Sequence, residues 1–281
     1  MSTGSKWTCP GFEIVEHPGA RVLARPEAVG WIRYVLESGK GIHLAASLDK
    51  EVLQMEGRDS VYVIPSKASR SRKAAEESSE APEVFSEPPG KRWAVRHYTR
   101  GGRLVSRLLH DRYLRSSRIR PYHEVAASEE ARRRGIPTPR VVAACLYPTR
   151  LFYRADLVTE FVHSASDLVM ALFSTHKKGA GGAGERMDAL QASGELIRQM
   201  AGVGVRHRDL HAGNILLKWE GAAPRPHLLD LDRCEVGSRS KQVSAKPMQQ
   251  RLERSLRKWE SRTGIRITEK EWETLDRAVT P

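Results

Sequence analysis

The chain has 281 residues, 40% of them hydrophobic and 29% charged, which is typical of a globular protein with one large domain or two packed lobes. Lys and Arg number 47 against 34 Asp and Glu. The resulting net charge of +13 favours anionic partners such as nucleic acid, phosphate-bearing substrates or an anionic membrane face, although a merely basic surface has the same charge. The three cysteines lie far apart and indicate neither a disulfide framework nor a zinc site. We expect no signal peptide and no bilayer-spanning segment, and therefore a cytoplasmic protein.

The first predicted elements are a helix, a strand and a long insertion. Residues 26–38 carry apolar side chains at helical spacing behind Pro26, which suits a first helical turn, and a strand is expected at 60–64. The next segment, 65–91, is rich in Ser, Glu, Lys and Pro and cannot bury a core. We therefore expect it to be a disordered surface insertion.

Strands and helices alternate after the insertion. Strands are expected at 92–96, 141–147 and 152–161, and helices at 103–114, 122–134, 166–175, 187–202 and within 248–279. Strands that come early and helices that come late predict an α+β protein with two lobes. Its parts are a β-rich N-terminal lobe of residues 1–158, a connector at 159–163 and a helical C-terminal lobe at 164–281.

The strongest motif is HRDLHAGN at residues 207–214, which matches the kinase catalytic-loop pattern H-R-D-L-x-x-x-N at each fixed position. Phosphoryl transfer needs a carboxylate that orients the acceptor hydroxyl and takes its proton, and Asp209 is predicted to do this. The side-chain carbonyl of Asn214 can supply an oxygen ligand to Mg²⁺. His207 and Arg208 complete the candidate catalytic group, and the motif predicts an ATP-dependent kinase.

A second acidic motif ends the apolar run HLLDLD at residues 227–232. Its Asp230 follows Asn214 by 16 residues and occupies the place of the D-F-G element, whose Asp binds the Mg²⁺ that bridges the ATP phosphates. Leu231 and Asp232 stand where that element has Phe and Gly. We interpret Asp230 as a metal ligand.

A basic residue on an early strand is predicted to bind the ATP phosphates. The segment WAVR, ending at Arg96, lies where a kinase has V-A-I-K, and an arginine can also bind phosphate, although with a different geometry from lysine. Its partner should be a glutamate on the following helix. Glu124 is the first choice, and Glu129 and Glu130 are alternatives.

The remaining predicted ATP contacts come from two short segments. No G-x-G-x-x-G loop is present, so the phosphates are expected to rely on backbone N–H groups near Gly57 and on Arg58. In a kinase-like architecture the backbone of Glu160, Phe161 and Val162 forms the lobe connector and meets the adenine edge.

Together these segments resemble the Kdo/WaaP lipopolysaccharide kinase family, and in particular its 3-deoxy-D-manno-octulosonic acid (Kdo) kinase branch. The resemblance is carried by VRHYTRGG at 95–102, RPYHE at 120–124, GIPTP at 135–139, DLVTE at 156–160, the catalytic loop and LDLDRC at 229–234. It implies a protein-kinase-like fold, MgATP as donor, and Kdo–lipid A or another anionic sugar as acceptor. It also implies work at the cytoplasmic face of the inner membrane, and no nucleic acid partner.

Two other functions remain open from the residues. One is a protein or small-molecule kinase of the same fold; the other is a catalytically weak ATP-binding pseudokinase scaffold, which Arg96 in place of lysine favours. Fifteen residues separate Asp232 from Met248 and contain no A-P-E sequence, which is too little for a peptide platform. A small or lipid-linked acceptor fits better. Basic residues at 100–107 and 251–258 are candidates to hold it.

Overall fold

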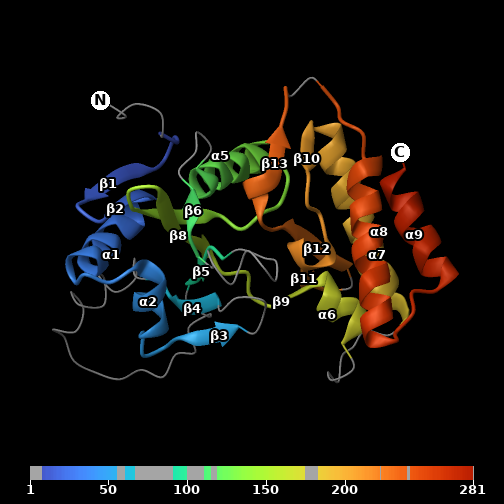
Figure 1. Cartoon of the computed structure of the whole chain (residues 1–281). Helices are drawn as coiled ribbons and strands as arrows, with labels where there is room; N and C mark the ends of the chain where they lie inside the picture. The colour runs from blue at the N-terminus through green and yellow to red at the C-terminus, as the bar shows by residue number, and fades with distance from the viewer. Residues whose placement is uncertain are drawn as a thin grey trace. The chain divides into compact units, whose positions relative to one another are not determined.

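The computed structural model describes residues 8–55, 61–66, 91–99, 111–114, 119–174, 183–221, 223–238 and 241–280. The chain forms two compact units, which are Met1–Val125 with Arg140–Phe161, and Ala126–Pro139 with Val162–Pro281 (Figure 1). The sequence analysis assigned residues 126–139 to the first lobe. In the structure they belong to the second unit, because Ala131 and Ile136 are buried in its core.

The first unit is built on one antiparallel sheet with strand order β1-β2-β7-β8-β5-β4-β3. A short strand, β6, also pairs with β8. The strands are β1 (Glu13–His17), β2 (Ala20–Ala24), β3 (Leu53–Met55), β4 (Val61–Pro65), β5 (Arg92–His97), β6 (Tyr113–Leu114), β7 (Val141–Pro148) and β8 (Phe152–Glu160). The helices that begin in this unit are α1 (Pro26–Glu37), α2 (Ile42–Ser47) and α5 (Arg120–Arg133).

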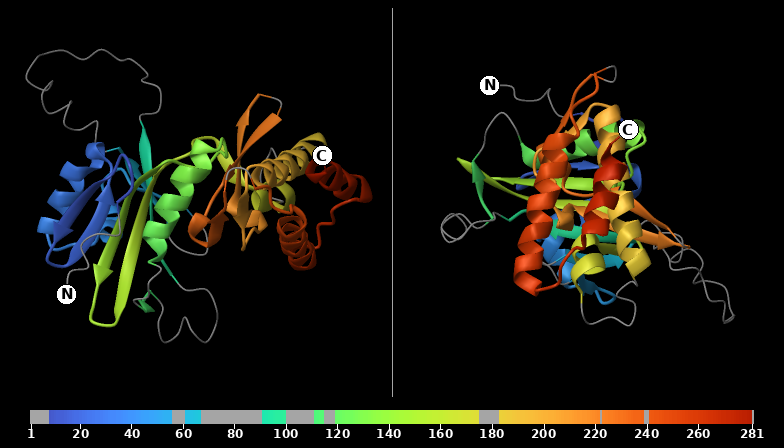
Figure 2. Two further views of the ribbon diagram at one scale, coloured as in Figure 1. Left: turned by 90° about the horizontal axis from the view of Figure 1, so that it is seen from above. Right: turned by 90° about the vertical axis from the view of Figure 1, so that its right-hand side faces the viewer.

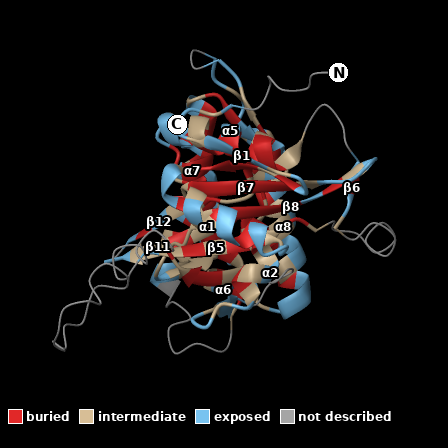
Figure 3. Ribbon diagram, turned by 90° about the vertical axis from the view of Figure 1, so that its left-hand side faces the viewer, coloured by how far each residue is buried: buried red, intermediate tan, exposed pale blue. Residues whose placement is uncertain are grey.

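Strand β7 is buried on both faces, which is why its sequence is an unbroken apolar run (Figure 3). Val142 and Cys145 pack in the cluster that contains the buried residues of α1 and α2. Val141 and Ala144 pack in the cluster that contains the start of α5. The sheet is therefore covered on each face by helix, and β5, two strands from β7, is held in the middle of this arrangement.

Strands β4 and β5 are hydrogen-bonded up to Ser66 and Lys91, so the chain lies close together at these two residues. The two strands pair from Val61 opposite Arg96 to Pro65 opposite Arg92, and the N–H of Ser66 then donates to the carbonyl of Lys91 at 2.8 Å. The predicted insertion lies between these residues. Most of it, 67–90, is outside the described part of the chain.

The second unit is mainly helical. Its strands are β9 (Ala165–Asp167), β10 (Val205–His207), β11 (Ile215–Glu220), β12 (Ala223–Leu228) and β13 (Cys234–Val236), with short 3₁₀ turns η1 (Ala212–Asn214) and η2 (Leu231–Arg233). Its helices are α6 (Leu168–Phe173), α7 (Ala183–Gly202), α8 (Lys246–Thr263) and α9 (Glu269–Val279), and Figure 2 shows the last three together. No helix among the described residues is both long enough and apolar enough to cross a membrane.

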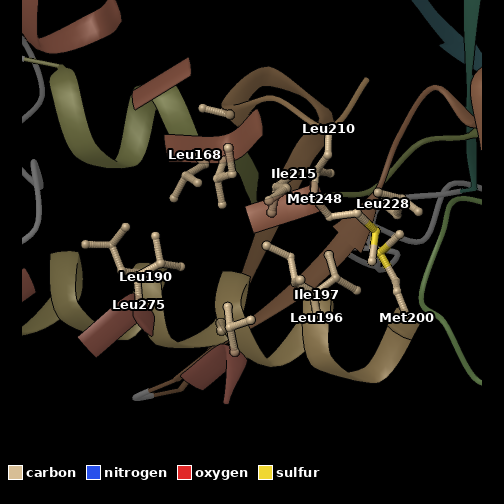
Figure 4. Close-up of a cluster of buried hydrophobic side chains, with 14 of the residues drawn as sticks. Leu168, Leu190, Leu196, Ile197, Met200, Leu210, Ile215, Leu228, Met248 and Leu275 are labelled. Atoms are coloured by element: carbon tan, nitrogen blue, oxygen red, sulfur yellow. The ribbon is translucent and has the colours of Figure 1, made fainter. Parts of the chain in front are cut away.

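The core of the second unit joins the catalytic-loop segment to the helices (Figure 4). Leu210, directly after Asp209, is fully buried there together with Leu228 and Met248. Helices α7 and α9 cross closely at Gly194, where an added Cβ would lie 2.6 Å from the Cβ of Ala278. The loop that carries the candidate base is therefore anchored by buried apolar side chains.

Most predicted elements are present, and two predictions need correction. Residues 103–114 were expected to be helical, but Tyr113 and Leu114 form strand β6 and 103–110 lie outside the described residues. The helix expected at 166–175 begins only at Leu168, because residues 165–167 pair with β11 as strand β9. The sequence analysis did not predict β1, β2, α2 or β3.

Candidate active site

Two hydrogen-bonded strands bring the candidate metal ligands together. Strands β11 and β12 pair with Ile215 opposite Leu228, and one step further the N–H of Leu229 donates to the carbonyl of Asn214 at 2.9 Å. Asn214 thus precedes one strand and Asp230 follows the other at the same end of the pair. The distance of 16 residues in sequence is closed by this hairpin.

His207 is a buried support of the loop and does not face solvent. Its Nδ1 accepts a hydrogen bond from the N–H of Asp209 at 3.1 Å, so the neutral ring carries its proton on Nε2, which lies 3.3 Å from the carbonyl of Leu229. Burial, the largest effect, lowers the pKa of His207 and keeps the ring neutral. His207 therefore ties the backbone of Asp209, the candidate base, to the segment that carries Asp230.

The Asp209 carboxylate lies between two arginines. Nη1 of Arg251 is 3.3 Å from its Oδ1, and Nη1 of Arg233 is 3.4 Å from its Oδ2. The Asp209 side chain is 40% exposed, so an acceptor hydroxyl can reach it. The sequence analysis did not predict either contact.

Arg208, predicted as part of the catalytic group, pairs with a different carboxylate. Its guanidinium contacts Glu235 of β13, while its backbone N–H donates to the carbonyl of Arg233 at 3.4 Å. Strands β10 and β13 pair with His207 opposite Cys234. The side chain of Arg208 thus links the loop to β13 and does not contact Asp209.

Asn214 and Asp230 have the donor chemistry that Mg²⁺ requires. Asn214 is buried, and its Nδ2 donates to the carbonyl of Asp209 at 3.1 Å, which fixes the orientation of the amide and leaves Oδ1 as the acceptor. No group of three or more His, Cys, Asp or Glu residues lies within metal-binding reach in the described part of the chain. Magnesium needs only one or two protein oxygens when phosphate and water complete its shell, so the two residues fit this ion.

Asp230 has a left-handed backbone, with φ of 58° and ψ of 59°. This conformation is uncommon outside glycine and costs about 1–2 kcal/mol. It turns the chain sharply from the end of β12 into η2. The turn leads to Arg233 within three residues.

Arg96 and Glu124 form an ion pair within the first unit. Nη2 of Arg96 lies 2.6 Å from both carboxylate oxygens of Glu124, which is almost fully buried. Glu124 also accepts a hydrogen bond from the hydroxyl of Tyr98, and the Arg96 guanidinium lies 4.9 Å from the centre of the Tyr98 ring. Of the alternative partners, Glu130 instead pairs with Arg133 and Arg134.

Two backbone N–H groups of the predicted connector already donate hydrogen bonds within the first unit. The N–H of Glu160 donates to the carbonyl of Arg140 at 2.8 Å, and the N–H of Phe161 donates to the carbonyl of Arg92 at 2.9 Å. An adenine edge would therefore have to use the N–H of Val162 or carbonyl oxygens. Gly57 and Arg58 lie outside the described residues, so their predicted role stays a prediction.

Comparison with known proteins identifies the family. Residues 67–278 match the Lipopolysaccharide kinase (Kdo/WaaP) family. The chain belongs to this family. It is therefore an enzyme, an ATP-dependent phosphotransferase with an alcohol group as acceptor. The resemblance and the α+β, two-lobed protein-kinase-like fold predicted from the sequence are confirmed.

Relatives of this lipopolysaccharide kinase carry a more specific name. The chain is 35% identical over 185 residues to the 3-deoxy-D-manno-octulosonic acid kinase of Actinobacillus succinogenes, covering 65% of this chain and 72% of that protein. It is 33% identical over 193 residues to the enzyme of the same name from Haemophilus influenzae, covering 67% and 76%. A solved structure, WaaP in complex with acyl carrier protein, aligns with a TM-score of 0.49 and 16% identity over 96% of this chain and 90% of that chain.

Motif spacing did not predict three residues that contact the candidate site residues: Tyr98 contacts Glu124 in the first unit, and Arg233 and Arg251 contact Asp209 in the second. Tyr98 follows Arg96 by two residues, directly after the end of β5, and its N–H still donates to the carbonyl of Ala155 in β8 at 2.9 Å, so it keeps the alternation that places its side chain on the same face as Arg96. Arg251 shares a helix face with Met248, but only the packing of α8 on the loop brings that face to Asp209. No local signal in the sequence indicates that Arg233 meets Asp209.

Proposed function

We propose that this kinase transfers the γ-phosphoryl group of ATP to a hydroxyl of the Kdo residue in the inner core of lipopolysaccharide. Several relatives named 3-deoxy-D-manno-octulosonic acid kinase, 31% to 35% identical over about two thirds of the chain, are the observation that carries this proposal. The exposed carboxylate of Asp209, held on a loop that matches the kinase pattern, supports it.

Asp209 acts as the base in this proposal. The acceptor hydroxyl oxygen attacks the γ-phosphorus, the bond from that phosphorus to the β,γ-bridging oxygen breaks, and ADP leaves. The hydroxyl proton passes to the Asp209 carboxylate. His207 holds the backbone of Asp209, and the buried Leu210 anchors the loop behind it.

Asn214 and Asp230 hold the magnesium ion in this proposal, each through a side-chain oxygen. Bound Mg²⁺ supplies positive charge that neutralises the phosphates. Arg96, oriented by Glu124, binds the ATP phosphates, since a guanidinium suits phosphate oxygens. The N–H of Val162 is the connector group proposed for the adenine.

The acceptor is proposed to be Kdo–lipid A, reached at the cytoplasmic face of the inner membrane. The net charge of +13 favours a surface that carries anionic lipid. The basic residues along α8, from Arg251 to Lys258, support such an acceptor. The enzyme would associate with the membrane surface peripherally.

The test incubates the purified protein with γ-labelled ATP and Mg²⁺ against Kdo–lipid A, lipid A without Kdo, peptides and aminoglycosides. We expect label only in Kdo–lipid A. Asp209→Asn should lower turnover by about 10²- to 10⁴-fold, the usual contribution of a general base, while leaving the unfolding temperature close to wild type. Transfer to peptides or aminoglycosides instead of Kdo–lipid A would contradict the proposed acceptor, and wild-type turnover by folded Asp209→Asn would contradict the proposed base.

A further inference from the structure

Two guanidinium groups hold the two oxygens of the catalytic carboxylate. Arg251 contacts Oδ1 and Arg233 contacts Oδ2 of Asp209 at 3.3 Å and 3.4 Å. The two guanidinium groups therefore flank the carboxylate that the acceptor hydroxyl has to approach.

Helix α8 holds Arg251 in place by its packing. On one face of the helix, Met248 accepts a hydrogen bond from the N–H of His207 through its sulfur at 3.4 Å, and Ser255 accepts one from the N–H of Ala212 at 3.2 Å. Leu252 is fully buried between them. Arg251 lies on this face, three residues after Met248 and four before Ser255, so it faces the catalytic loop.

Arg233 contacts the other oxygen of the same carboxylate from a different segment of the chain. It ends η2, directly before β13, and the carbonyl of Arg233 accepts from the N–H of Arg208. This bond places the Arg233 backbone against the loop, one residue before Asp209. The backbone of Arg233 is thus held by a hydrogen bond to the loop, and that of Arg251 by the packing of its helix, while both side chains reach Asp209.

Among the residues that the structure describes, the contacts of these two guanidinium groups leave several of their N–H donors available. The Arg233 side chain is 56% exposed and the Arg251 side chain is 45% exposed. An arginine presents five N–H donors in a planar fork that matches a carboxylate. Each of these arginines contacts Asp209 through its Nη1 atom. Both can bind a second planar anion beside the base.

We propose that Arg233 and Arg251 bind the carboxylate of the acceptor sugar, an inference that rests on the proposed function. Kdo is a sugar acid, and its carboxyl group is ionised at neutral pH. A carboxylate suits the planar N–H donors of the two guanidinium groups. When it binds, the arginines transfer from Asp209 to the sugar acid. The same step places the acceptor next to Asp209.

The test pairs each arginine with the group it is proposed to bind. Arg233→Gln and Arg251→Gln are assayed with Kdo–lipid A and with the same acceptor after its carboxyl group has been reduced to an alcohol. With the natural acceptor, each change should raise KM and lower kcat/KM by about 10- to 100-fold, as expected for loss of a hydrogen bond to a charged group. With the reduced acceptor, variants and wild type should differ by less than about threefold.

Arg262→Gln is the matched control, because Arg262 is an exposed arginine near the end of the same helix and lies outside the basic stretch 251–258. It should leave kcat/KM unchanged for both acceptors. A third acceptor, Kdo–lipid A stripped of its lipid phosphates, separates the two anionic groups of the natural substrate. If the penalty in the arginine variants disappears with this acceptor and persists with the reduced one, the arginines bind lipid phosphate and the proposal is overturned.

The outcomes also separate this inference from the proposed function. Equal penalties for natural and reduced acceptors would mean that the arginines only position Asp209, and would overturn the inference while leaving the acceptor intact. Failure of the wild-type protein to phosphorylate any Kdo acceptor would overturn the proposed function. It would also overturn the Kdo carboxylate as the group that the two arginines bind.

Discussion

Glu124 is the residue whose surroundings lead to the sharpest prediction about ATP. Its buried carboxylate is held by Arg96 and Tyr98, so its removal affects a buried charge pair. Arg96→Ala and Glu124→Gln should each lower kcat/KM for ATP, and the double variant should lose less than the sum, with a coupling of about 1–3 kcal/mol. The measurement is a double-mutant cycle in steady-state kinetics.

Glu129→Gln is the control for this cycle, since it changes another glutamate of α5. It should leave the effect of Arg96→Ala unchanged. Additive losses for Arg96 and Glu124 would show that their contact has no part in ATP use. Arg96→Lys should keep the pairing, because a single nitrogen of Arg96 reaches both oxygens of Glu124. It should still weaken ATP use, because an ammonium lacks the planar donors that match phosphate.

At this scale the sequence predicted a set of candidate site residues, whose roles stay predictions, and did not predict which side chains they contact. The spacing of Asp209, Asn214 and Asp230 reflects a local loop and one hairpin, which a motif can encode. The contact from Arg251 to Asp209 joins residues 42 positions apart and exists only because α8 packs on the loop. Contacts of this kind depend on tertiary structure, so no motif contains them.

Helices α7 and α9 provide a prediction at the scale of elements. A side chain at Gly194 would meet the Cβ of Ala278 at 2.6 Å and the carbonyl of Leu275 at 2.9 Å. Gly194→Ala should therefore force the helices apart and destabilise the protein by about 1–3 kcal/mol, despite the better helix propensity of alanine. Gly184→Ala, in the same helix with open space around it, should leave the unfolding temperature unchanged or slightly higher. Equal unfolding temperatures for both variants would contradict the close crossing.

A polar network joins α2 to the sheet and predicts a pH dependence. Buried Asp156 accepts from the hydroxyl of Tyr147 and the N–H of His43, and lies 2.6 Å from Nδ1 of His97, whose other nitrogen is 3.6 Å from Asp111. Burial alone would lower the pKa of His97, but the hydrogen bond and charge of Asp156, aided by Asp111, outweigh it and raise the pKa above 6.5. Protonated His97 therefore stabilises the folded state.

The sign of this effect follows from the raised pKa. The stabilisation is fully present below about pH 6.5 and is lost as pH rises through the higher pKa of the folded protein. Unfolding temperatures of wild type and His97→Gln, measured in parallel from acid to mildly alkaline pH, should differ most at low pH and converge at high pH. His207 has the opposite shift but is present in both proteins, so it cancels. A gap that widens with pH would refute the assignment.

Sequence periodicity predicted the long elements and failed for the short ones. Strand β7 is an apolar run buried on both faces, β8 contains the buried apolar pair Leu157 and Val158, and α1 has a clear apolar stripe behind Pro26. The hairpin of β1 and β2 and the six-residue helix α2 have too few residues for a period to show. Their positions depend on pairing with β7 and on the Asp156 network, which are long-range.

At the scale of the whole molecule, the hydrogen bond between Ser66 and Lys91 predicts that a short turn can replace the 24 residues between them. These two residues are already hydrogen-bonded at 2.8 Å, so Asn-Gly can join them as a two-residue hairpin turn. The shorter loop lowers the entropic cost of closure by on the order of 2 kcal/mol. The unfolding temperature and ATP affinity should not fall. A protein that no longer folds after the exchange would show that residues 67–90 contribute to the core.

The left-handed backbone of Asp230 implies that activity and thermal robustness are in conflict at this position. Glycine adopts this conformation without strain, so Asp230→Gly should raise the free energy of unfolding by about 1 kcal/mol while removing the carboxylate that we propose binds magnesium. A library randomised at residue 230 and selected by heat alone should become enriched in glycine and lose its enzyme activity. The same library selected for phosphoryl transfer should retain aspartate, and retention of aspartate under heat selection would show that the strain is relieved elsewhere in the fold.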